Sequence, residues 1–393
     1  MKSFTLILLA IVLTAHIPAI AQWTSIASGT SQVLKSTFIT SNNRIVIAGE
    51  TGVLKYSDNS GTTWTDATKT FTDDINEIHF VNASIGFVAA DDGFILRTMD
   101  AGATWTTVST GIASNIESVH FLNVSTGMAV GRSGEVLKTI DGGTNWTLQS
   151  SGSTQRLEDV YMIDANTAIV VGRSGTILKT NNGGSTWNPI TTGVAMDFND
   201  VHFTSATVGY AASEVGYVWN TADAGTSWNS ISTGTTSDLK GLAFKSASEI
   251  YACGEMGVIM RSTDAGISWT TQTTTTLREL EDIAINSTMG FSVGNLGEIQ
   301  FQGTTSGIND QNSMIDPCVL INNNSELSLS CDNAQVDITR IKFFDILGKN
   351  VKDLDLRSNS EVNISGSLRP GIYFYQLITA DGQAINSRKF VIN

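Results

Sequence analysis

One pattern of apolar and polar positions repeats every 41 residues through most of the chain. Within the second unit, the short apolar runs Ile75 to Val81, Gly86 to Ala90 and Phe94 to Thr98 are separated by turn residues, and a fourth run starts at Trp105. Runs of this length and alternation predict β-strands, so each unit is expected to contain four. Seven of the eight tryptophans mark the repeat: Trp23, Trp64, Trp105, Trp146, Trp187, Trp228 and Trp269.

A unit of about 40–50 residues with four strands is typical of a β-propeller blade, whereas an open solenoid would need polar caps at its ends. The last unit supplies Leu280 to Ile285, Met289 to Val293 and Glu298 to Gln302, and then no tryptophan. The segment Trp23 to Ile26 is a fourth strand without a blade. Joining the two ends removes the exposed sheet edges. The sequence therefore predicts an all-β, seven-bladed propeller over residues 22–307, closed by its N-terminal strand.

A short polar motif precedes six of the tryptophans, and in each copy a Gly follows two residues after an Asn or Asp. An Asx side chain accepts backbone N–H groups in a tight turn, and Gly supplies the positive φ that the turn needs. Because Asn keeps the acceptor but loses the charge, we interpret these residues as structural turns and not as catalysts. We expect the tryptophans to pack between blades. The turn residues are Asn59, Asp100, Asp141, Asn182, Asp223 and Asp264.

The motif, as in Asp141-Gly142-Gly143-Thr144-Asn145-Trp146, resembles the Asp-box, or BNR repeat, of sialidases, sortilin-type receptors and xyloglucan hydrolases. The whole unit, with its Gly-Arg-Ser-Gly and Ile-Leu-Lys-Thr runs, is similar to the propeller of photosystem II assembly factors over roughly residues 22–305. The resemblance implies a propeller fold with structural Asp-box turns. It does not imply a photosynthetic role.

The N-terminus has the features of a secretory signal peptide. Lys2 precedes an apolar run from Phe4 to Ala15, and small residues lead up to Ala21. This arrangement predicts cleavage after Ala21. The run is shorter than the roughly 20 apolar residues that span a bilayer. We therefore expect residues 1–21 to be removed and the exported protein to have no transmembrane segment.

The 41-residue pattern stops before a polar linker at residues 308–314, and alternating strands over residues 315–393 predict a small β-sandwich. The motifs Phe344 to Lys349, Leu368 to Phe374 and Lys389 to Ile392 resemble the C-terminal sorting domain of the Bacteroidota type IX secretion system. The resemblance implies recognition by that machinery, passage through the outer membrane, and then release or attachment at the cell surface.

The composition narrows the function classes. Lys and Arg number 23 against 37 Asp and Glu, giving a net charge of −14, which argues against a nucleic-acid partner. Three cysteines without a CxxC motif exclude a zinc ribbon or a dithiol redox site. In an exported tail, a disulfide between Cys318 and Cys331 is favoured over two buried thiols. Cys253 lies in an apolar strand and is predicted to be in the core.

Three histidines occupy one position of the first strand, where other units carry Phe38, Tyr161 or an alanine; they are His79, His120 and His202. No carboxylate or cysteine completes a ligand set at this spacing. We therefore interpret the histidines as packing against a neighbouring blade, and we expect neither a metal nor a cofactor.

The sequence favours a non-catalytic exported scaffold that binds a protein or a glycan. No G-x-S-x-G nucleophile motif occurs, and only Arg132 and Arg173 are arginines at matching loop positions, whereas a sialidase would need three. The alternative is a sialidase-like or xyloglucanase-like glycoside hydrolase acting at one propeller face. That activity would require a suitably spaced pair of carboxylates.

The candidate binding residues lie in exposed turns between the second and third strands, two places before a Gly. They are Glu50, Asp91, Arg132, Arg173, Glu214, Glu255 and Asn295. We expect them to share a face with the acids that start the first strands, which are Glu77, Glu117, Asp159, Asp200 and Asp282. Arg132 and Arg173, in adjacent blades, would bind a carboxylate, a phosphate or a sugar hydroxyl edge. The alternative is a solvated charged surface.

Overall fold

The chain divides into two compact units, Met1–Ser306 and Gly307–Asn393, and each is described by itself. The predicted signal peptide and the 308–314 linker lie outside the described residues. The computed structural model describes residues 23–303, 318–323, 326–331, 338–345, 349–355, 361–363, 371–379 and 384–392.

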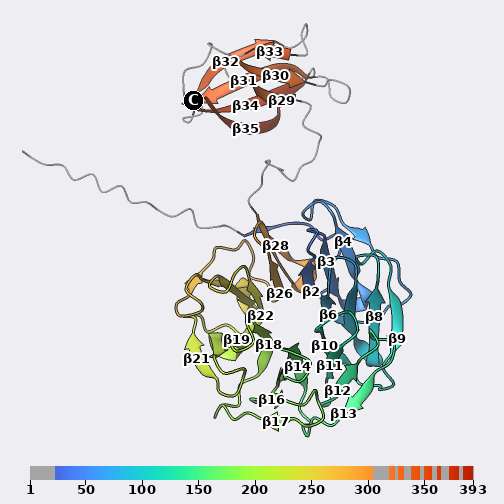
Figure 1. Ribbon diagram of the computed structural model, residues 1–393. Helices are drawn as coiled ribbons and strands as arrows, with labels where there is room; N and C mark the ends of the chain where they lie inside the picture. Colours follow the sequence, from blue (N-terminus) through green and yellow to red (C-terminus); the bar gives the residue numbers. More distant parts are fainter. Residues whose placement is uncertain are drawn as a thin grey trace, which may run out of the picture. The chain divides into compact units, whose positions relative to one another are not determined.

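The first unit is a ring of seven four-stranded antiparallel sheets, which confirms the predicted propeller (Figure 1). Blade 1 contains β2 (Leu34–Ile39), β3 (Ile45–Gly49), β4 (Leu54–Ser57) and β5 (Thr65–Asp66). Blade 2 contains β6 (Ile75–Phe80), β7 (Gly86–Ala90), β8 (Phe94–Thr98) and β9 (Thr106–Ser109). Blade 3 contains β10 (Ile116–Phe121), β11 (Gly127–Gly131), β12 (Val136–Thr139) and β13 (Thr147–Gln149). Blade 4 contains β14 (Leu157–Met162), β15 (Ala168–Gly172), β16 (Ile177–Thr180) and β17 (Asn188–Pro189). Blade 5 contains β18 (Phe198–Phe203), β19 (Gly209–Ser213), β20 (Tyr217–Thr221) and β21 (Asn229–Ser232). Blade 6 contains β22 (Leu239–Phe244), β23 (Ile250–Gly254), β24 (Ile259–Ser262) and β25 (Thr270–Thr271).

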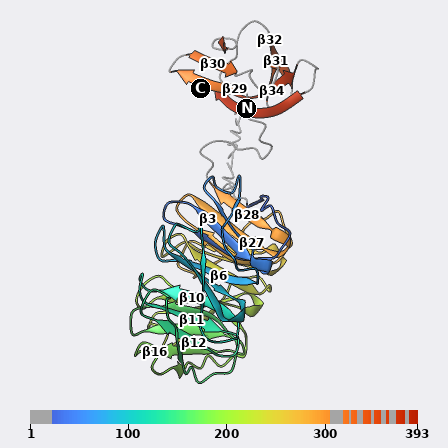
Figure 2. The ribbon, with the colours of Figure 1, turned by 90° about the vertical axis from the view of Figure 1, so that its right-hand side faces the viewer.

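Within each blade the strands follow one another from the centre of the ring outward. Figure 1 shows the first strands β2, β6, β10, β14, β18, β22 and β26 around the centre, and Figure 2 shows β10, β11 and β12 side by side in one sheet. Five of the turns between second and third strands are short 3-10 helices: η1 (Glu50–Gly52), η2 (Asp91–Gly93), η3 (Glu214–Gly216), η4 (Glu255–Gly257) and η5 (Asn295–Gly297).

The N-terminal strand closes the ring, as the sequence predicts. Blade 7 consists of β26 (Leu280–Ile285), β27 (Met289–Gly294), β28 (Ile299–Gly303) and β1 (Thr24–Ser25). Thr24 lies opposite Phe301 in this pairing, and Ser25 lies opposite Gln300. Trp23 is fully buried, with its ring edge-on to Tyr251 of blade 6 at 6.1 Å between centroids. Segments at opposite ends of the propeller sequence therefore share one sheet.

Each repeat tryptophan lies in an apolar cluster built by two adjacent blades. Trp105 packs with Val46 of blade 1 and Val88 of blade 2. Trp64 lies where blade 1 meets blade 7, beside Leu34 and Phe291. Burying an aromatic side chain removes roughly 150–250 Å² from water, so each tryptophan contributes strongly to the contact between its two blades.

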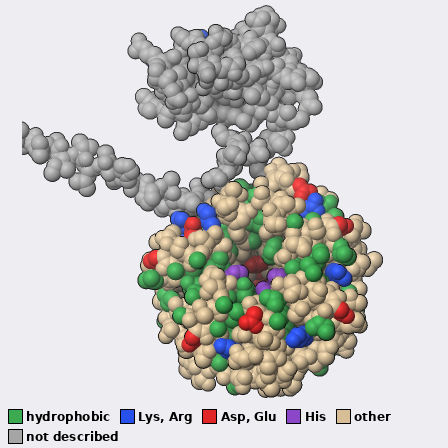
Figure 3. Space-filling view, viewed as in Figure 1, with side chains coloured by type: hydrophobic (Ala, Val, Ile, Leu, Met, Phe, Trp, Pro, Cys, Tyr) green, Lys and Arg blue, Asp and Glu red, His purple; other side chains and the backbone are tan. Residues whose placement is uncertain are grey.

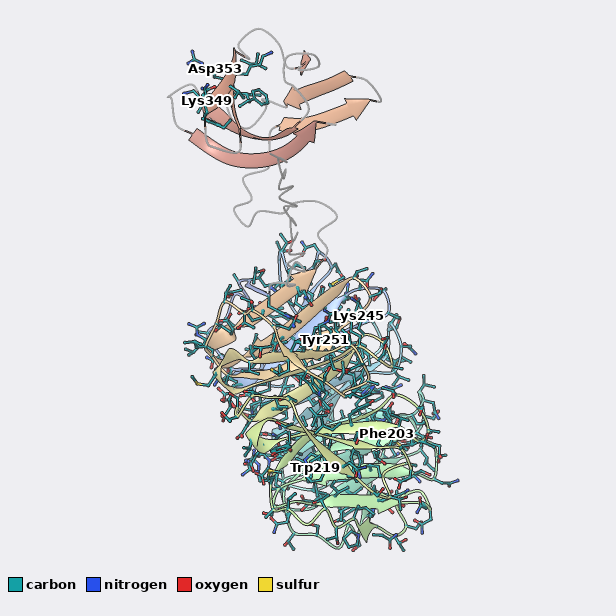
Figure 4. The ribbon with its side chains drawn as sticks, turned by 90° about the vertical axis from the view of Figure 1, so that its left-hand side faces the viewer. Phe203, Trp219, Lys245, Tyr251, Lys349 and Asp353 are labelled. Atoms are coloured by element: carbon teal, nitrogen blue, oxygen red, sulfur yellow. The ribbon has the colours of Figure 1, made fainter. Side chains whose placement is uncertain are left out.

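Two further buried residues lie outside the set of repeat tryptophans. Cys253 is fully buried, which confirms that it belongs to the core. The eighth tryptophan, Trp219, is 4% exposed in blade 5, and its Nε1 donates to Ser213 Oγ at 3.1 Å (Figure 4).

The second unit contains a three-stranded and a four-stranded antiparallel sheet, in the orders β29-β30-β33 and β32-β31-β34-β35. Its strands are β29 (Cys318–Asn323), β30 (Glu326–Cys331), β31 (Ile338–Asp345), β32 (Asn350–Asp355), β33 (Glu361–Asn363), β34 (Gly371–Thr379) and β35 (Ala384–Ile392). The sandwich arrangement of these sheets stays a prediction. Cys318 lies directly opposite Cys331 in the β29–β30 pairing. Directly opposed antiparallel residues have a Cα spacing of about 4.5–5.5 Å, which a disulfide can span. The disulfide also stays a prediction.

Candidate functional site: the turn face and the central channel

The propeller has two different faces, because each blade is an up-and-down meander. The turn between the second and third strands meets the start of the first strand through a backbone hydrogen bond, such as Glu50 N to Val33 O at 2.9 Å and Arg173 N to Arg156 O at 2.9 Å. The corresponding bond occurs in all seven blades. The seven candidate turn residues therefore share one face, here called the turn face. The Asp-box turns, between third and fourth strands, lie on the opposite Asp-box face.

The Asp-box side chains are tied within their own turns. Asp100 Oδ1 accepts from Thr104 N and from Thr98 Oγ1, both at 2.8 Å, and Oδ2 accepts from Thr104 Oγ1 at 2.7 Å. Asn59 Oδ1 accepts from Thr63 N at 2.9 Å in the same way, and its Nδ2 donates to Thr63 Oγ1 at 2.8 Å. Asn can thus replace Asp by exchanging one acceptor for a donor.

These local bonds stabilise the ionised Asp-box carboxylates. Hydrogen bonds from Asn145 lower the pKa of Asp141 to about 2. Hydrogen bonds from the Ser268 side chain and backbone lower the pKa of Asp264 to about 2 as well. An acid that stays ionised and fully hydrogen-bonded is suited to holding a turn, and poorly suited to transferring a proton at neutral pH.

A β-bulge lies at the start of each first strand, among the acids that the sequence analysis grouped together. In blade 3 the register shifts between Ile116 and Ser118, so that Glu117 lies on the bulge. Glu77, Asp159, Asp200 and Asp282 occupy the next repeat position, equivalent to Ser118. All five acids line one cavity, and Glu117 lies one residue before the repeat position of the other four. The other four, here called the channel carboxylates, line the central channel.

Arg132 and Arg173 are not an isolated pair of cations. Glu117 binds Arg132 Nε at 2.8 Å and Arg156 Nη2 at 2.8 Å, and Glu158 binds Arg156 Nε at 3.0 Å and Arg173 Nε at 2.8 Å. The side chains of Arg132 and Arg173 remain 48% and 49% exposed. Only Nε of each makes a hydrogen bond among the described residues, so the terminal nitrogens of both guanidiniums are available. The hydrogen bond that Arg173 donates to Glu158 raises the pKa of Arg173.

A cavity of about 420 Å³ opens at the turn face. Of the seven candidate turn residues, Glu50, Arg173 and Asn295 line it. Burial and the neighbouring charge of Glu279 raise the pKa of Glu281, also in the lining, to about 7. The bulge residues of all seven blades form the mouth of the cavity: Lys35, Asn76, Glu117, Glu158, Asn199, Lys240 and Glu281. The sequence analysis singled out only Glu117 of this set, because the bulge that turns these side chains inward leaves no mark in the apolar pattern.

Blades 5 to 7 add three exposed apolar side chains, here called the apolar arc. Val215, Met256 and Leu296 directly follow the candidate turn residues, and they are 48%, 61% and 61% exposed. Their φ angles are 59°, 57° and 58°. The left-handed region disfavours a β-branched residue such as Val215. At the equivalent place, blades 1 to 4 carry Thr51, Asp92, Ser133 and Ser174. Sequence analysis missed this arc because isolated apolar residues in polar turns form no periodic pattern.

A second cavity, of about 400 Å³, shares the channel carboxylates with the first and continues the channel toward the Asp-box face. Figure 3 shows histidine side chains around this opening, with acidic side chains deeper inside. His79 Nε2 lies 3.3 Å from Phe121 O in the next blade, so the expected contact with a neighbouring blade is present. That expectation was nevertheless incomplete, because His79, His120 and His202 also line the channel.

The channel histidines are neutral at pH 7. Burial lowers the pKa of His79 and of His202 to about 4, and it lowers the pKa of His120 well below its usual range. Within residues 23–303 and the described tail segments, no group of three or more His, Cys, Asp or Glu is placed to hold a metal ion. The histidines therefore contribute uncharged aromatic rings to the channel wall.

The fold and its repeated turns define a seven-bladed Asp-box propeller. Residues 98–240 match the family described as photosynthesis system II assembly factor YCF48, and residues 322–393 match the secretion system C-terminal sorting domain. The chain is thus a seven-bladed propeller that is similar to the YCF48 family over residues 98–240, followed by a sorting domain. None of the curated proteins matches it.

Solved structures share the propeller fold. YCF48 from Cyanidioschyzon merolae is 18% identical with a TM-score of 0.61, over 72% of this chain and 99% of that one. A structure described as YCF48 bound to D1 peptide is 17% identical with a TM-score of 0.61, over 72% and 97%. The Niastella koreensis GH74 enzyme is 15% identical with a TM-score of 0.60, over 78% of this chain and 59% of the enzyme. At these identities the likeness shows the fold alone.

The sorting domain implies type IX secretion to the outside of the cell or to its surface. No helix among the described residues is long and apolar enough to cross a membrane. Cleavage after Ala21 stays a prediction.

Proposed function

We propose that the exported propeller is a non-catalytic binding module that holds a protein partner on its turn face. The observation that carries this proposal is the combination, on one face, of two arginines with available terminal nitrogens and an apolar arc in the neighbouring blades. Arg173 belongs to blade 4 and Val215 to blade 5, so the charged and apolar parts adjoin. Protein interfaces combine apolar contact residues with arginine, and Met and Arg are enriched in them.

The arginines would bind a carboxylate of the partner. Glu117, Arg156 and Glu158 hold the Nε side of both guanidiniums, so less side-chain entropy is lost when the remaining nitrogens bind. Phosphate is the alternative ligand, because two of its oxygens can also accept from a guanidinium in a bidentate manner. The surrounding acids Glu50, Asp91, Glu214 and Glu255 would repel partners that present anions elsewhere.

The apolar arc favours a protein over a glycan. The seven residues that follow the candidate turn positions include aliphatic and polar side chains, but no aromatic ring on which a sugar could stack. Val215 holds a backbone conformation that costs free energy, and it exposes an apolar side chain, so packing within the fold does not explain it. The YCF48 structure described as bound to D1 peptide indicates that a propeller of this fold is able to bind a peptide.

A glycoside hydrolase is the alternative function. It is supported by the likeness of fold to the GH74 enzyme. Retaining hydrolases place their two carboxyl groups about 5–5.5 Å apart, and inverting ones place them further apart. Asp159 and Asp200 line the same channel in adjacent blades, so they are the pair in which this activity is tested.

Photo-crosslinking from position 256 on the full chain, in cells that secrete it, would identify the partner. Position 140 is the matched control, because Ile140 is 75% exposed on the Asp-box face. With the partner in hand, Arg132→Ala combined with Arg173→Ala should weaken binding by about 1–3 kcal/mol without changing the melting temperature. Unaltered affinity in that double variant would show that the charges of this face are only solvated surface. Release of sugars by the wild-type chain, lost in Asp159→Asn, would favour the hydrolase.

A further inference from the structure

The central channel contains buried carboxylates that have no part in the proposed binding on the turn face. Its two cavities, of about 420 and 400 Å³, meet at Glu77, Asp159, Asp200 and Asp282. These four carboxylates come from blades 2, 4, 5 and 7. No lysine or arginine of residues 23–303 forms an ion pair with any of them, although arginines compensate Glu117 and Glu158 at the channel mouth.

Hydrogen bonds reach both oxygens of Asp159 and of Asp282, but only one oxygen each of Glu77 and Asp200. Glu77 Oε2 accepts from Val119 N at 3.1 Å, and Asp200 Oδ2 accepts from Leu242 N at 2.6 Å. Burial raises the pKa of Glu77, Asp200 and Asp282, and the charge of Asp159 raises all three further. A buried carboxylate without a cation is costly, and a bound cation would remove that cost.

Toward the Asp-box face, the carboxylates are screened by six rings, here called the aromatic collar: Phe38, His79, His120, Tyr161, His202 and Phe244. Successive ring centroids from His79 through His120 and Tyr161 are 4.6 and 4.4 Å apart, and His202 stacks on Phe244 at 4.4 Å. Aromatic faces attract ammonium groups. Because the imidazoles are neutral at pH 7, they do not repel a cation.

The collar is open on one side. Blades 6 and 7 carry Ala243 and Ala284 at the position where blade 1 carries Phe38, and both alanines line the cavity. A slim apolar chain can therefore pass the collar.

Two polar side chains of the cavity lining, Thr37 and His202, also have groups that make no hydrogen bond to another described residue. Thr37 is 4% exposed and lines the second cavity, and its buried Oγ1 has no hydrogen-bond partner. The equivalent residues of the other blades are Ile, Val or Leu, so packing alone does not call for a hydroxyl there. Neither ring nitrogen of His202, which lines the same cavity, makes a hydrogen bond to another described residue. A hydroxyl and a neutral imidazole can both accept from a cationic donor.

We propose that the channel binds a linear alkylammonium ion, which enters through the aromatic collar from the Asp-box face and places its ammonium group among Glu77, Asp159, Asp200 and Asp282. One oxygen each of Glu77 and Asp200 is held by a neighbouring blade, so these carboxylates offer single oxygens and not a bidentate edge. Three rotating N–H donors on one nitrogen suit this arrangement better than the planar fork of a guanidinium. The ion is either a free polyamine or a lysine side chain of another protein.

Calorimetric titration of the full chain with spermidine, and separately with a lysine-containing peptide, tests the proposal at pH 8 and low salt. Saturable binding in either arm supports it, and the tighter arm identifies the source. Asp200→Asn should reduce the affinity at least tenfold. Asp223→Asn removes the same charge from an Asp-box and should leave the affinity unchanged.

A channel-filling variant keeps the test valid if Asp200→Asn fails to fold. Ala284→Phe introduces the residue that blade 1 already carries at this position, changes no charge, and should reduce binding at least tenfold. Failure of both ligands to bind the folded wild-type chain would overturn the proposal. Equal losses in Asp200→Asn and Asp223→Asn would also overturn it, since they would show that the amine is only a counter-ion of an acidic protein. These results are independent of Arg132 and Arg173, so the turn-face proposal stands or falls separately.

Discussion

The propeller contains two sets of carboxylates that occur at fixed positions of the same 41-residue repeat and behave in opposite ways. The Asp-box acids lie in exposed turns, and local hydrogen bonds lower the pKa of Asp141 and Asp264 to about 2. Among the channel carboxylates, burial raises the pKa of Glu77 and Asp200. An acid bound by its own turn stabilises the fold as an ion, whereas an acid buried beside other acids does not.

The repeat shows the same difference in sequence. The six Asp-box positions carry only Asp or Asn, whereas the seven channel positions carry Ser36, Glu77, Ser118, Asp159, Asp200, Gly241 and Asp282. Folding of a blade therefore restricts the first set and leaves the second free. Side chains that folding leaves free are the ones in which we look for function.

The largest expected effect is on the unfolding free energy and comes from a structural residue of the repeat, Trp23. Trp23→Ala should lower the unfolding free energy by about 3–5 kcal/mol, because it empties a fully buried site between blades 6 and 7. Urea unfolding followed by tryptophan fluorescence measures this effect in the propeller alone, since all eight tryptophans lie between residues 23 and 269. An unchanged midpoint would contradict closure by the N-terminal strand.

The next largest effect is a pH-dependent change in stability, which we expect when His202 of the aromatic collar is replaced. The pKa of His202 is about 4 in the fold, against about 6.5 in an unfolded chain, so the unfolded state binds more protons between these values. Its contribution to stability is therefore present above pH ~6.5 and lost as the pH falls. His202→Phe should gain about 2 kcal/mol relative to wild type between pH 8 and pH 5. A pH-independent difference between the two chains would mean that this imidazole is not buried in a neutral form.

A smaller effect is expected at the Asp-boxes. Asp100→Ala should cost about 1 kcal/mol, because it leaves Thr104 N without its acceptor. Asp100→Asn should cost less, since Asn59 makes the corresponding bond at 2.9 Å. Chemical unfolding of the three chains at pH 7 measures both differences. Equal losses for Ala and Asn would show that the charge, and not the acceptor, holds the turn.

The number of blades, the Asp-box turns and the bounds of several strands could be predicted from the sequence. The spacing of Trp23 to Trp269 predicted seven blades, and the motif around Asp141 predicted the turn at the end of the third strand. Strands such as Gly86–Ala90 and Leu280–Ile285 have the predicted bounds. These features depend on contacts within a blade or between neighbours, which the repeat encodes directly.

The site depends on contacts that no single blade determines. A bulge after Ile116 places Glu117 at the mouth of the cavity beside Arg132 and Arg156, and a shift of one residue is invisible in an alternating pattern. Arg156 links Arg132 to Arg173 by reaching into the previous blade, to Glu117. Ser36 Oγ donates to Asp282 Oδ2 at 2.9 Å across 246 residues. Such contacts exist only after the ring has closed, so the lining of the channel could not be predicted from the repeat.

The difference between the two carboxylate sets is tested most directly by comparing Asp200→Asn and Asp223→Asn with wild type between pH 5 and pH 8. The histidines are common to the three chains, and because burial, together with the charges of Asp159 and Asp282, raises the pKa of Asp200, the Asp200→Asn difference reports on the channel carboxylates as a group. Burial raises the pKa of Asp200, and its charge therefore becomes more destabilising as the pH rises. Burial also acts to raise the pKa of Asp223, but hydrogen bonds from Ser227 outweigh it and lower that pKa to about 2, so its contribution is constant in this range. We expect Asp200→Asn to become progressively more stable relative to wild type as the pH rises from ~5 to ~8, and Asp223→Asn to show a constant small loss. Parallel profiles for the two variants would contradict the distinction between structural and channel carboxylates.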